Sequence, residues 1–229
     1  MNKSGLARLD LINKKLLKDG ADLLLLLEKG FLLFYDLEKP SEAASAIIKA
    51  IKLDKKNIHA RFLLANVYYN GYGDVYKAKD VLEEALEIDK NGVECIALLA
   101  EILFFLTQNR IVSFLKAIIY MKRAIKIEPY WIGQRIRFAN ILAEFGFSGM
   151  AENILNDGLR LDEIGLVFKP KYLFMDEFYK LHVTGIGHYT KNDLSSLLRD
   201  LRVSREKSFF HRIFHWIYSF FKKFLFWRR

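Results

Sequence analysis

Apolar side chains return every three or four residues through most of the first 165 positions, and short polar or glycine-containing turns separate the periodic stretches. This period is typical of helices with one buried face. It predicts an amphipathic helix over residues 4–18, which has a leucine-rich side. Four more apolar helices are expected over residues 24–35, 60–69, 96–106 and 135–145.

A second set of helices alternates with these four, and its members share one pattern. A small residue is followed seven positions later by another small residue, and then by an apolar, a charged, an apolar and an acidic residue. The four pairs are Ala43/Ala50, Ala78/Ala85, Ala117/Ala124 and Ala151/Gly158. The later member recurs after 35, 39 and 34 residues, a period found in stacked helical repeats. The 39-residue spacing gives the third repeat extra residues near 105–113, which either lengthen its helices or form a protruding turn.

The pattern resembles the tetratricopeptide repeat (TPR) family over residues 21–165. In that family each repeat is a hairpin of a helix A and a helix B. Helix B contains small residues and ends with an apolar residue, an acidic residue and a proline. This chain keeps the closing proline only at Pro129, and Arg61 and Arg135 stand near the position of the family's large aromatic residue. The resemblance implies an all-α helical-hairpin solenoid of about four repeats with capping helices, since one pair alone cannot bury its apolar face.

We expect four segments along the chain. They are an N-terminal helix (1–20), the repeat array (21–165), a capping helix at 171–182 with a linker (166–189), and a basic amphipathic helical tail (190–229). Hydrophobic residues make up 52% of the 229 positions, which excludes a wholly disordered chain. No apolar run follows the basic start of the sequence, so we expect no cleaved leader.

Positive charge is concentrated in the tail. Residues 190–229 hold ten Lys and Arg against three Asp and Glu, a net charge of +7, whereas the first 189 residues hold 26 against 24. Ten of the nineteen residues from 209 to 227 are aromatic. On a helix their apolar face lies opposite a basic face. The residues predicted to contact a membrane are Phe210, Arg212, Ile213, Phe214, Trp216, Ile217, Phe220, Phe221, Lys222, Lys223, Phe224, Leu225 and Trp227.

The sequence leaves three interpretations of this tail open. A bulky apolar face with a basic polar face and aromatic edges is typical of a helix lying in the plane of a membrane surface. A spanning anchor is the second interpretation, and the adjacent Lys222 and Lys223 argue against it. The third is a helix that folds back onto the array or packs on a partner chain. A separate helix is predicted at 192–206, with Leu194, Leu197, Leu198 and Leu201 on one face.

The sequence contains little that indicates catalysis. Cys95 is the single cysteine, so no disulfide framework or cysteine-based metal cage is possible, and its place in a predicted A helix suits a buried side chain. His211 and His215 are four residues apart, but they lie among basic residues, and we interpret them as polar-face residues of a helix. We therefore expect no enzymatic activity, no cofactor and no bound metal.

By the same resemblance, TPR arrays bind peptides or helices of other proteins in a concave groove lined by the A helices. Asn66 and Asn140 stand where carboxylate-clamp TPRs hold a C-terminal carboxylate, although the accompanying lysines are incomplete. The groove candidates are His59, Phe62, Asn66, Tyr69, Asn70, Glu101, Phe104, Arg137, Asn140 and Glu144.

The sequence thus favours a protein–protein interaction scaffold in the cytoplasm, peripheral at the inner face of a membrane. A part of a bacterial membrane machine, such as a flagellar motor or a secretion apparatus, would use both the array and the tail. One alternative is a secretion-type TPR chaperone. Another is nucleic-acid binding through the tail, which the separation of its aromatic and basic residues disfavours, since stacking and phosphate contacts work best on one surface.

Overall fold

The computed structural model describes residues 3–18, 22–106, 111–129, 131–161, 192 and 194–203, and every regular element in these ranges is a helix. The predicted fold class, an all-α array of helix pairs, is confirmed. The chain divides into two compact units, Met1–Glu128 and Pro129–Arg229. Within the described residues, the first unit holds three helix pairs and the second unit holds one.

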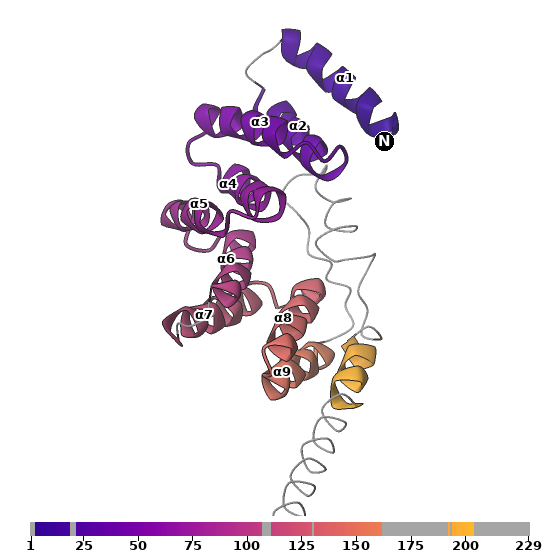
Figure 1. The fold of residues 1–229 in the computed structure, drawn as a ribbon, viewed down its shortest axis with the longest axis vertical. Helices are drawn as coiled ribbons and strands as arrows, with labels where there is room; N and C mark the ends of the chain where they lie inside the picture. Colours follow the sequence, from indigo (N-terminus) through magenta and orange to yellow (C-terminus); the bar gives the residue numbers. More distant parts are fainter. Residues whose placement is uncertain are drawn as a thin grey trace, which may run out of the picture. The chain divides into compact units, whose positions relative to one another are not determined.

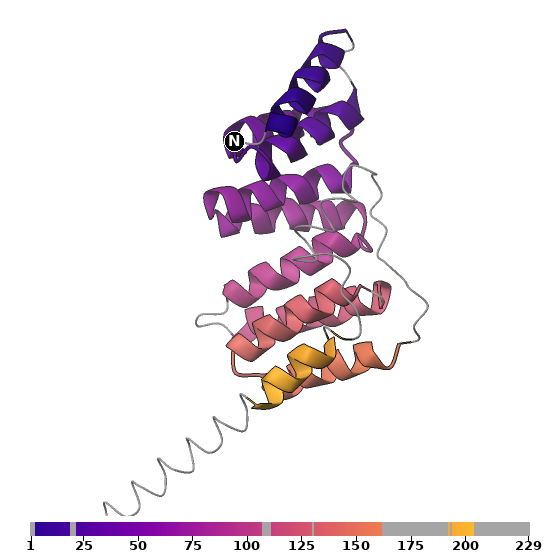
Figure 2. The same cartoon turned by 90° about the vertical axis from the view of Figure 1, so that its right-hand side faces the viewer.

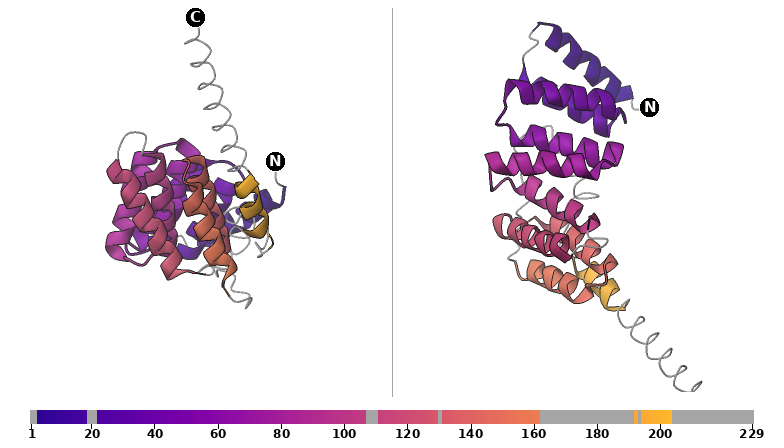
Figure 3. Two further views of the ribbon diagram at one scale, coloured as in Figure 1. Left: turned by 90° about the horizontal axis from the view of Figure 1, so that it is seen from below. Right: turned by 60° about the vertical axis from the view of Figure 1, so that its left-hand side comes forward.

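In the first unit the helices pair in chain order. The pairs are α2 with α3, α4 with α5, and α6 with α7, and α3 packs on α4 as α5 does on α6 (Figure 1, Figure 3). A π-helical turn, η1, extends α4, and α1 packs on α2. The bounds are α1 Lys3–Lys18, α2 Leu23–Tyr35, α3 Pro40–Leu53, α4 Ile58–Asn66, η1 Val67–Gly71, α5 Val75–Ile88, α6 Val93–Phe105 and α7 Ile111–Ile127.

Local sequence explains where these helices begin. The side chains of Asp22, Asn57 and Asp74 each accept a hydrogen bond from a backbone N–H three residues on, at 3.0, 2.9 and 3.0 Å. These bonds satisfy amides that have no partner inside the first turn. Pro40 opens α3, where its missing N–H costs nothing.

The small residues of the B helices lie in the helix crossings, as the repeat pattern predicts. Ala43, Ala50, Ala78, Ala85 and Ala117 are completely buried, and Ala124 is 1% exposed. A larger side chain at any of these positions would push the paired helices apart.

The 35-residue spacing between Ala50 and Ala85 has a structural counterpart in η1. A π turn closes hydrogen bonds to the fifth residue rather than the fourth, so it holds one residue more than an α turn. The backbone N–H of Tyr72 accordingly donates to the carbonyl of Val67. Gly73 then turns the chain into α5 with a φ of +66°. The repeat therefore accommodates its extra residue relative to the 34-residue period inside helix A.

The longer third repeat lengthens its helix B. Helix α7 has 17 residues, whereas α3 and α5 have 14 each. The sequence left open whether both helices of the repeat lengthen or a turn protrudes. Only helix B lengthens within the described residues, because α6 has 13 residues, as α2 and α8 do. Residues 107–110, where a turn would form, lie outside the described ranges.

The second unit contains α8 (Ile132–Glu144), α9 (Ser148–Leu159) and a helical stretch over residues 194–203. Gly146 joins α8 to α9 with a φ of +82°. The 194–203 helix lies beside α9 in Figure 2, and Leu194, which is completely buried, approaches the backbone of Gly158.

The predicted helix at 192–206 is thus confirmed over the residues that the structure describes. Leu198 is buried with Leu194, whereas Leu197 and Leu201 are half-buried. The predicted capping helix at 171–182, the rest of the predicted linker segment 166–189 and the tail residues 204–229 lie outside the described ranges.

Candidate partner-binding surface

Five of the predicted groove residues share one face of α4 and η1. His59, Phe62 and Asn66 follow one another at intervals of three and four positions, and Tyr69 and Asn70 lie three and four positions after Asn66. His59, Phe62 and Asn66 are buried, Tyr69 is half-buried and Asn70 is exposed. The accessible part of this face is therefore its end in η1.

A chain of amide hydrogen bonds orders that end. The Nδ2 of Asn66 donates to the carbonyl of Phe62 at 3.0 Å, and the Nδ2 of Asn70 donates to the Oδ1 of Asn66 at 3.3 Å. The ring of Tyr69 lies 6.0 Å from that of Phe105 on α6, centre to centre. Asn70 and Tyr69 thus present a fixed polar group and an aromatic ring side by side.

Two other predicted residues lie on α6 and are buried. Glu101 is 3% exposed, and Phe104 is completely buried, with its ring edge-on to that of Phe114 on α7 at 5.9 Å. Deeper in the same unit, the Nδ1 of His59 lies 3.4 Å from the Oε1 of Glu94, which brings two polar groups together across α4 and α6. These buried residues pack beneath the accessible end of the face and are not themselves available to a partner.

The remaining predicted residues lie on α8 in the second unit. Arg137 is half-buried, whereas Asn140 and Glu144 are exposed. Their spacing of three and four places them on one face of the helix. Asn140, the second candidate for holding a C-terminal carboxylate, is thus accessible to a ligand, whereas Asn66 is buried.

Arg135 shows why a residue that departs from the repeat pattern is tolerated. It is 4% exposed, and its guanidinium donates from Nε to the carbonyl of Pro129 at 2.8 Å and from an Nη to the carbonyl of Ile154 at 3.4 Å. Burial lowers the pKa of this guanidinium, and the carboxylate of Asp157 acts in the opposite direction. Arg135 thus ties α8 to α9 and does not contribute to the surface.

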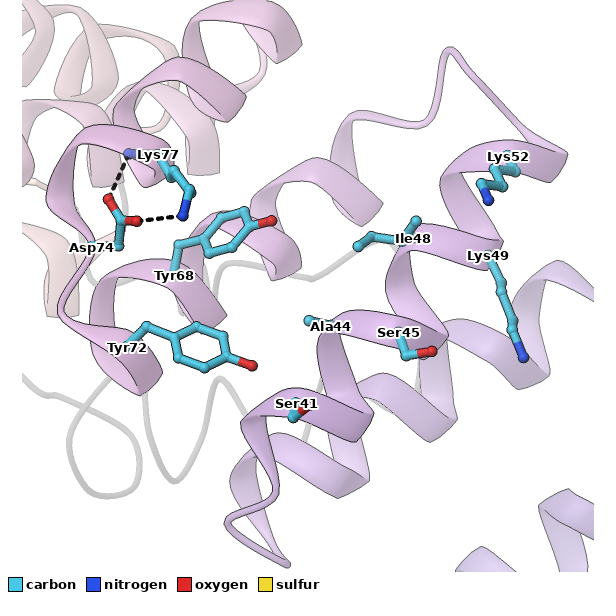
Figure 4. Close-up of a pocket in the computed structure, with 10 residues that line it drawn as sticks. All are labelled: Ser41, Ala44, Ser45, Ile48, Lys49, Lys52, Tyr68, Tyr72, Asp74 and Lys77. Carbon is cyan, nitrogen blue, oxygen red and sulfur yellow. Dashed lines mark hydrogen bonds and ion pairs between the residues drawn. The ribbon is translucent and has the colours of Figure 1, made fainter.

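The first unit also contains a pocket that the sequence patterns did not indicate. It has a volume of about 620 Å³ and lies between α3 on one side and η1 with the start of α5 on the other (Figure 4). The α3 side consists of Ser41, Ala44, Ser45, Ile48, Lys49 and Lys52. The opposite side consists of Tyr68, Tyr72, Asp74 and Lys77. The sequence signal for this pocket was the spacing of 35 residues between Ala50 and Ala85, one residue more than the 34-residue period.

Within the described ranges, no three His, Cys, Asp or Glu side chains come together as metal ligands would. None of the helices in those ranges is both long and apolar enough to cross a bilayer. All of the predicted membrane-contacting residues, from Phe210 to Trp227, lie outside them, as do His211 and His215.

No protein-family model and no curated protein sequence matches the chain. Several solved structures do match the chain. YrrB, described as a TPR protein with an unusual peptide-binding site, is 17% identical, with a TM-score of 0.53 over 88% of this chain and 97% of YrrB. MamA from Desulfovibrio magneticus RS-1 is 17% identical, with a TM-score of 0.55 over 69% of this chain and 86% of MamA. The TPR protein TTC0263 from Thermus thermophilus is 19% identical, with a TM-score of 0.52 over 62% of this chain and 75% of TTC0263.

These likenesses concern the backbone, and they agree with the residues: small side chains in each helix crossing, alternating A and B helices, and a period near 34 residues. The chain has the tetratricopeptide-repeat fold.

Proposed function

We propose that this chain is a non-catalytic interaction scaffold. The exposed end of the face on α4 and η1, at Tyr69 and Asn70, captures a segment of a partner protein; we call this the A-helix surface. The tail associates with a membrane surface on the cytoplasmic side. A bacterial membrane machine, such as a flagellar motor or a secretion apparatus, is a setting that would use both parts.

One observation carries the partner-binding part of the proposal: the exposed end of the A-helix face in η1. There the amide of Asn70 is held by Asn66, and the half-buried ring of Tyr69 stands beside it. An ordered amide pairs well with a peptide backbone, and a rigid aromatic ring supplies contact area at a low entropic cost. The description of YrrB as having a peptide-binding site is consistent with this use of the fold.

A quantitative pull-down tests this part. We expect Tyr69→Ala combined with Asn70→Ala to lose the partner, because the substitutions remove the accessible groups and leave the buried ones in place. The matched control is Tyr76→Ala combined with Asp80→Ala, since both residues are exposed on α5. Equal retention of the partner by the two variants would contradict the proposed surface.

The membrane part of the proposal is supported by sequence alone. The apolar arc that includes Phe214, Ile217 and Phe221 lies opposite Lys222 and Lys223 on a helix. Burial of such an arc contributes about 25 cal/mol per Å² of apolar surface. Attraction of basic residues to anionic lipids adds about 1 kcal/mol for each residue near the surface.

Flotation of the full chain with anionic liposomes separates the two contributions. We expect Lys222→Glu combined with Lys223→Glu to weaken binding and to reduce its dependence on salt. Replacing Phe214, Ile217 and Phe221 by serine should abolish binding at every salt concentration. Lys14→Glu combined with Lys15→Glu on α1 changes the net charge equally and should have little effect.

Three outcomes would contradict the in-plane tail. Resistance of the bound protein to an alkaline carbonate wash would indicate a spanning helix. Absence of liposome binding, together with a lower melting temperature on deletion of residues 208–229, would indicate a tail docked on the protein itself. Binding to nucleic acid but not to liposomes in a parallel shift assay would indicate that the basic tail serves nucleic acid.

A further inference from the structure

The pocket between α3 and η1 is lined on one side by Tyr68 and Tyr72, two tyrosines at the π turn. Tyr68 and Tyr72 are four residues apart; Tyr68 lies within η1, and Tyr72 follows it directly as the C-cap. Both side chains extend toward α3 in Figure 4, and their ring centres lie 6.2 Å apart. Tyr72 is 50% exposed, so its ring is accessible to a ligand in the pocket.

Within the described residues, the charges of the pocket are partly neutralised. Lys77 forms an ion pair with Asp74 at 2.9 Å, and its ammonium lies 5.8 Å from the centre of the Tyr68 ring. Lys49 and Lys52, by contrast, form no ion pair with any described residue, and both are exposed. The pocket therefore has two free positive charges along α3.

The α3 side is a linear array of donors. Ser41 and Ser45 present hydroxyl groups one helical turn apart, and Lys49 and Lys52 continue the same side of the helix. At 1.5 Å per residue, the distance along α3 from Ser41 to Lys52 is about 16 Å. An extended peptide covers that length with about five residues, at roughly 3.3 Å each. Ala44 and Ile48 provide an apolar strip beside the donors.

We propose that this pocket binds a short, extended, acidic segment of a partner protein that carries one apolar or aromatic side chain. The acidic groups of the segment pair with Lys49 and Lys52, and its apolar side chain packs between the rings of Tyr68 and Tyr72 and the strip on α3. This site is distinct from the A-helix surface described above.

Size and charge favour a peptide over other anions. A pocket of about 620 Å³ accommodates several side chains. Nucleic acids are bound by long basic stripes, whereas here two free lysines three residues apart match a pair of carboxylates. The mixture of rings, hydroxyl groups and an apolar strip suits a side chain of a peptide better than it suits a lone phosphate.

Fluorescence anisotropy on the full chain tests the proposal. The probes are fluorescein-labelled pentapeptides of the form Glu-Glu-X-Glu-Glu, where X is Phe, Tyr or Leu. We expect saturable binding that weakens at least tenfold in Lys49→Glu combined with Lys52→Glu. Lys122→Glu combined with Lys126→Glu on α7 changes the net charge equally at exposed positions and should weaken binding less than threefold.

The tyrosines have a matched control of their own. Tyr72→Ala should weaken binding at least fivefold, whereas Tyr76→Ala, which removes a ring that is 70% exposed on α5, should change it less than twofold. Both residues are surface residues, and a circular dichroism melt checks that each variant is folded. The pair Tyr69→Ala and Asn70→Ala should leave probe binding unchanged, so failure of this site and failure of the A-helix surface are distinguishable.

Three results would overturn the proposal. One is the absence of saturable binding with every probe. Another is equal weakening by the two lysine pairs, which would indicate attraction to the basic protein as a whole. The third is displacement of the probe by inorganic phosphate at the same concentration as by unlabelled peptide, which would indicate a simple anion site.

Discussion

The side chain of Ile47 on α3 packs directly against the bare Cα of Gly30 on α2. A Cβ atom placed on Gly30 would overlap the Cγ1 of Ile47 and lie 3.4 Å from the carbonyl oxygen of Ala43. Ile47 is 1% exposed and Ala43 is completely buried, so neither neighbour has space to move into. The first repeat thus uses a glycine in helix A, in addition to the small residues of helix B, to bring its helices together.

We therefore predict that Gly30→Ala destabilises the protein by about 1–3 kcal/mol, because overpacking outweighs the gain in helix propensity. Gly149→Ala is the control, since nothing lies within 4 Å of a Cβ there. That substitution should stabilise by up to about 1 kcal/mol. Urea unfolding of the two variants provides the measurement, and a stabilised Gly30→Ala variant would contradict the close crossing.

A second prediction concerns the crossing of α4 and α5. Ala85 is completely buried in α5, so Ala85→Leu should cost about 1–3 kcal/mol in stability. Glu87→Leu, two residues along the same helix at an exposed position, should change stability by less than about 0.5 kcal/mol. Equal urea midpoints for the two variants would mean that the repeat alignment is wrong.

How far the sequence predicts this fold depends on which residues carry the information. The pairs such as Ala78 and Ala85 recur with a fixed spacing of seven, so the B helices and their buried faces follow from counting. Gly30 and Arg135 break that pattern, and their roles depend on neighbours that are distant in sequence, Ile47 and Ile154. Local patterns do not contain such contacts.

The candidate sites show the same division. The face of α4 was predictable, because helical spacing alone groups Asn66 with Tyr69 and Asn70. The degree of burial was not, and Phe104 proves to be completely buried. The pocket on α3 escaped prediction because Tyr68 and Tyr72 reach it through a π turn, whose position depends on how the chain accommodates one extra residue.

A third prediction concerns the helix over residues 194–203. Leu194 is completely buried, and its Cδ1 would lie 3.1 Å from a Cβ on Gly158. Leu194→Ala should therefore destabilise the second unit by about 2–5 kcal/mol through lost burial and a residual cavity. Val203→Ala, which changes a residue that is 42% exposed, should have little effect.

Tryptophan fluorescence in urea isolates that unit. The chain has three tryptophans, and Trp216→Phe with Trp227→Phe leaves Trp131, which is 4% exposed at the start of α8. The transition reported by Trp131 should move to lower urea in the Leu194→Ala variant alone. If it does not move, the helix over residues 194–203 contributes nothing to the stability of α8 and α9.

The last prediction concerns pH. Cys95 is 1% exposed, and its Sγ lies 3.8 Å from the carbonyl oxygen of Ile58. Burial raises the pKa of this thiol well above its ordinary range, and the nearby carboxylates of Glu94 and Asp89 act in the same direction. In the unfolded chain the thiol ionises with a pKa of about 8.5, so unfolding releases a proton once the pH exceeds that value.

The stability due to the buried neutral thiol is consequently present below about pH 8 and declines as the pH rises through 9 and 10, by at most about 1.4 kcal/mol per pH unit. The Cys95→Ala variant lacks this dependence but keeps every other titrating group. The difference in unfolding free energy between the two proteins, measured in urea at pH 7 to 10, should therefore shift steadily against the wild type above pH 8.5. Parallel curves would show that the thiol is accessible to solvent, and it would then also react with a disulfide reagent in the native protein at pH 8.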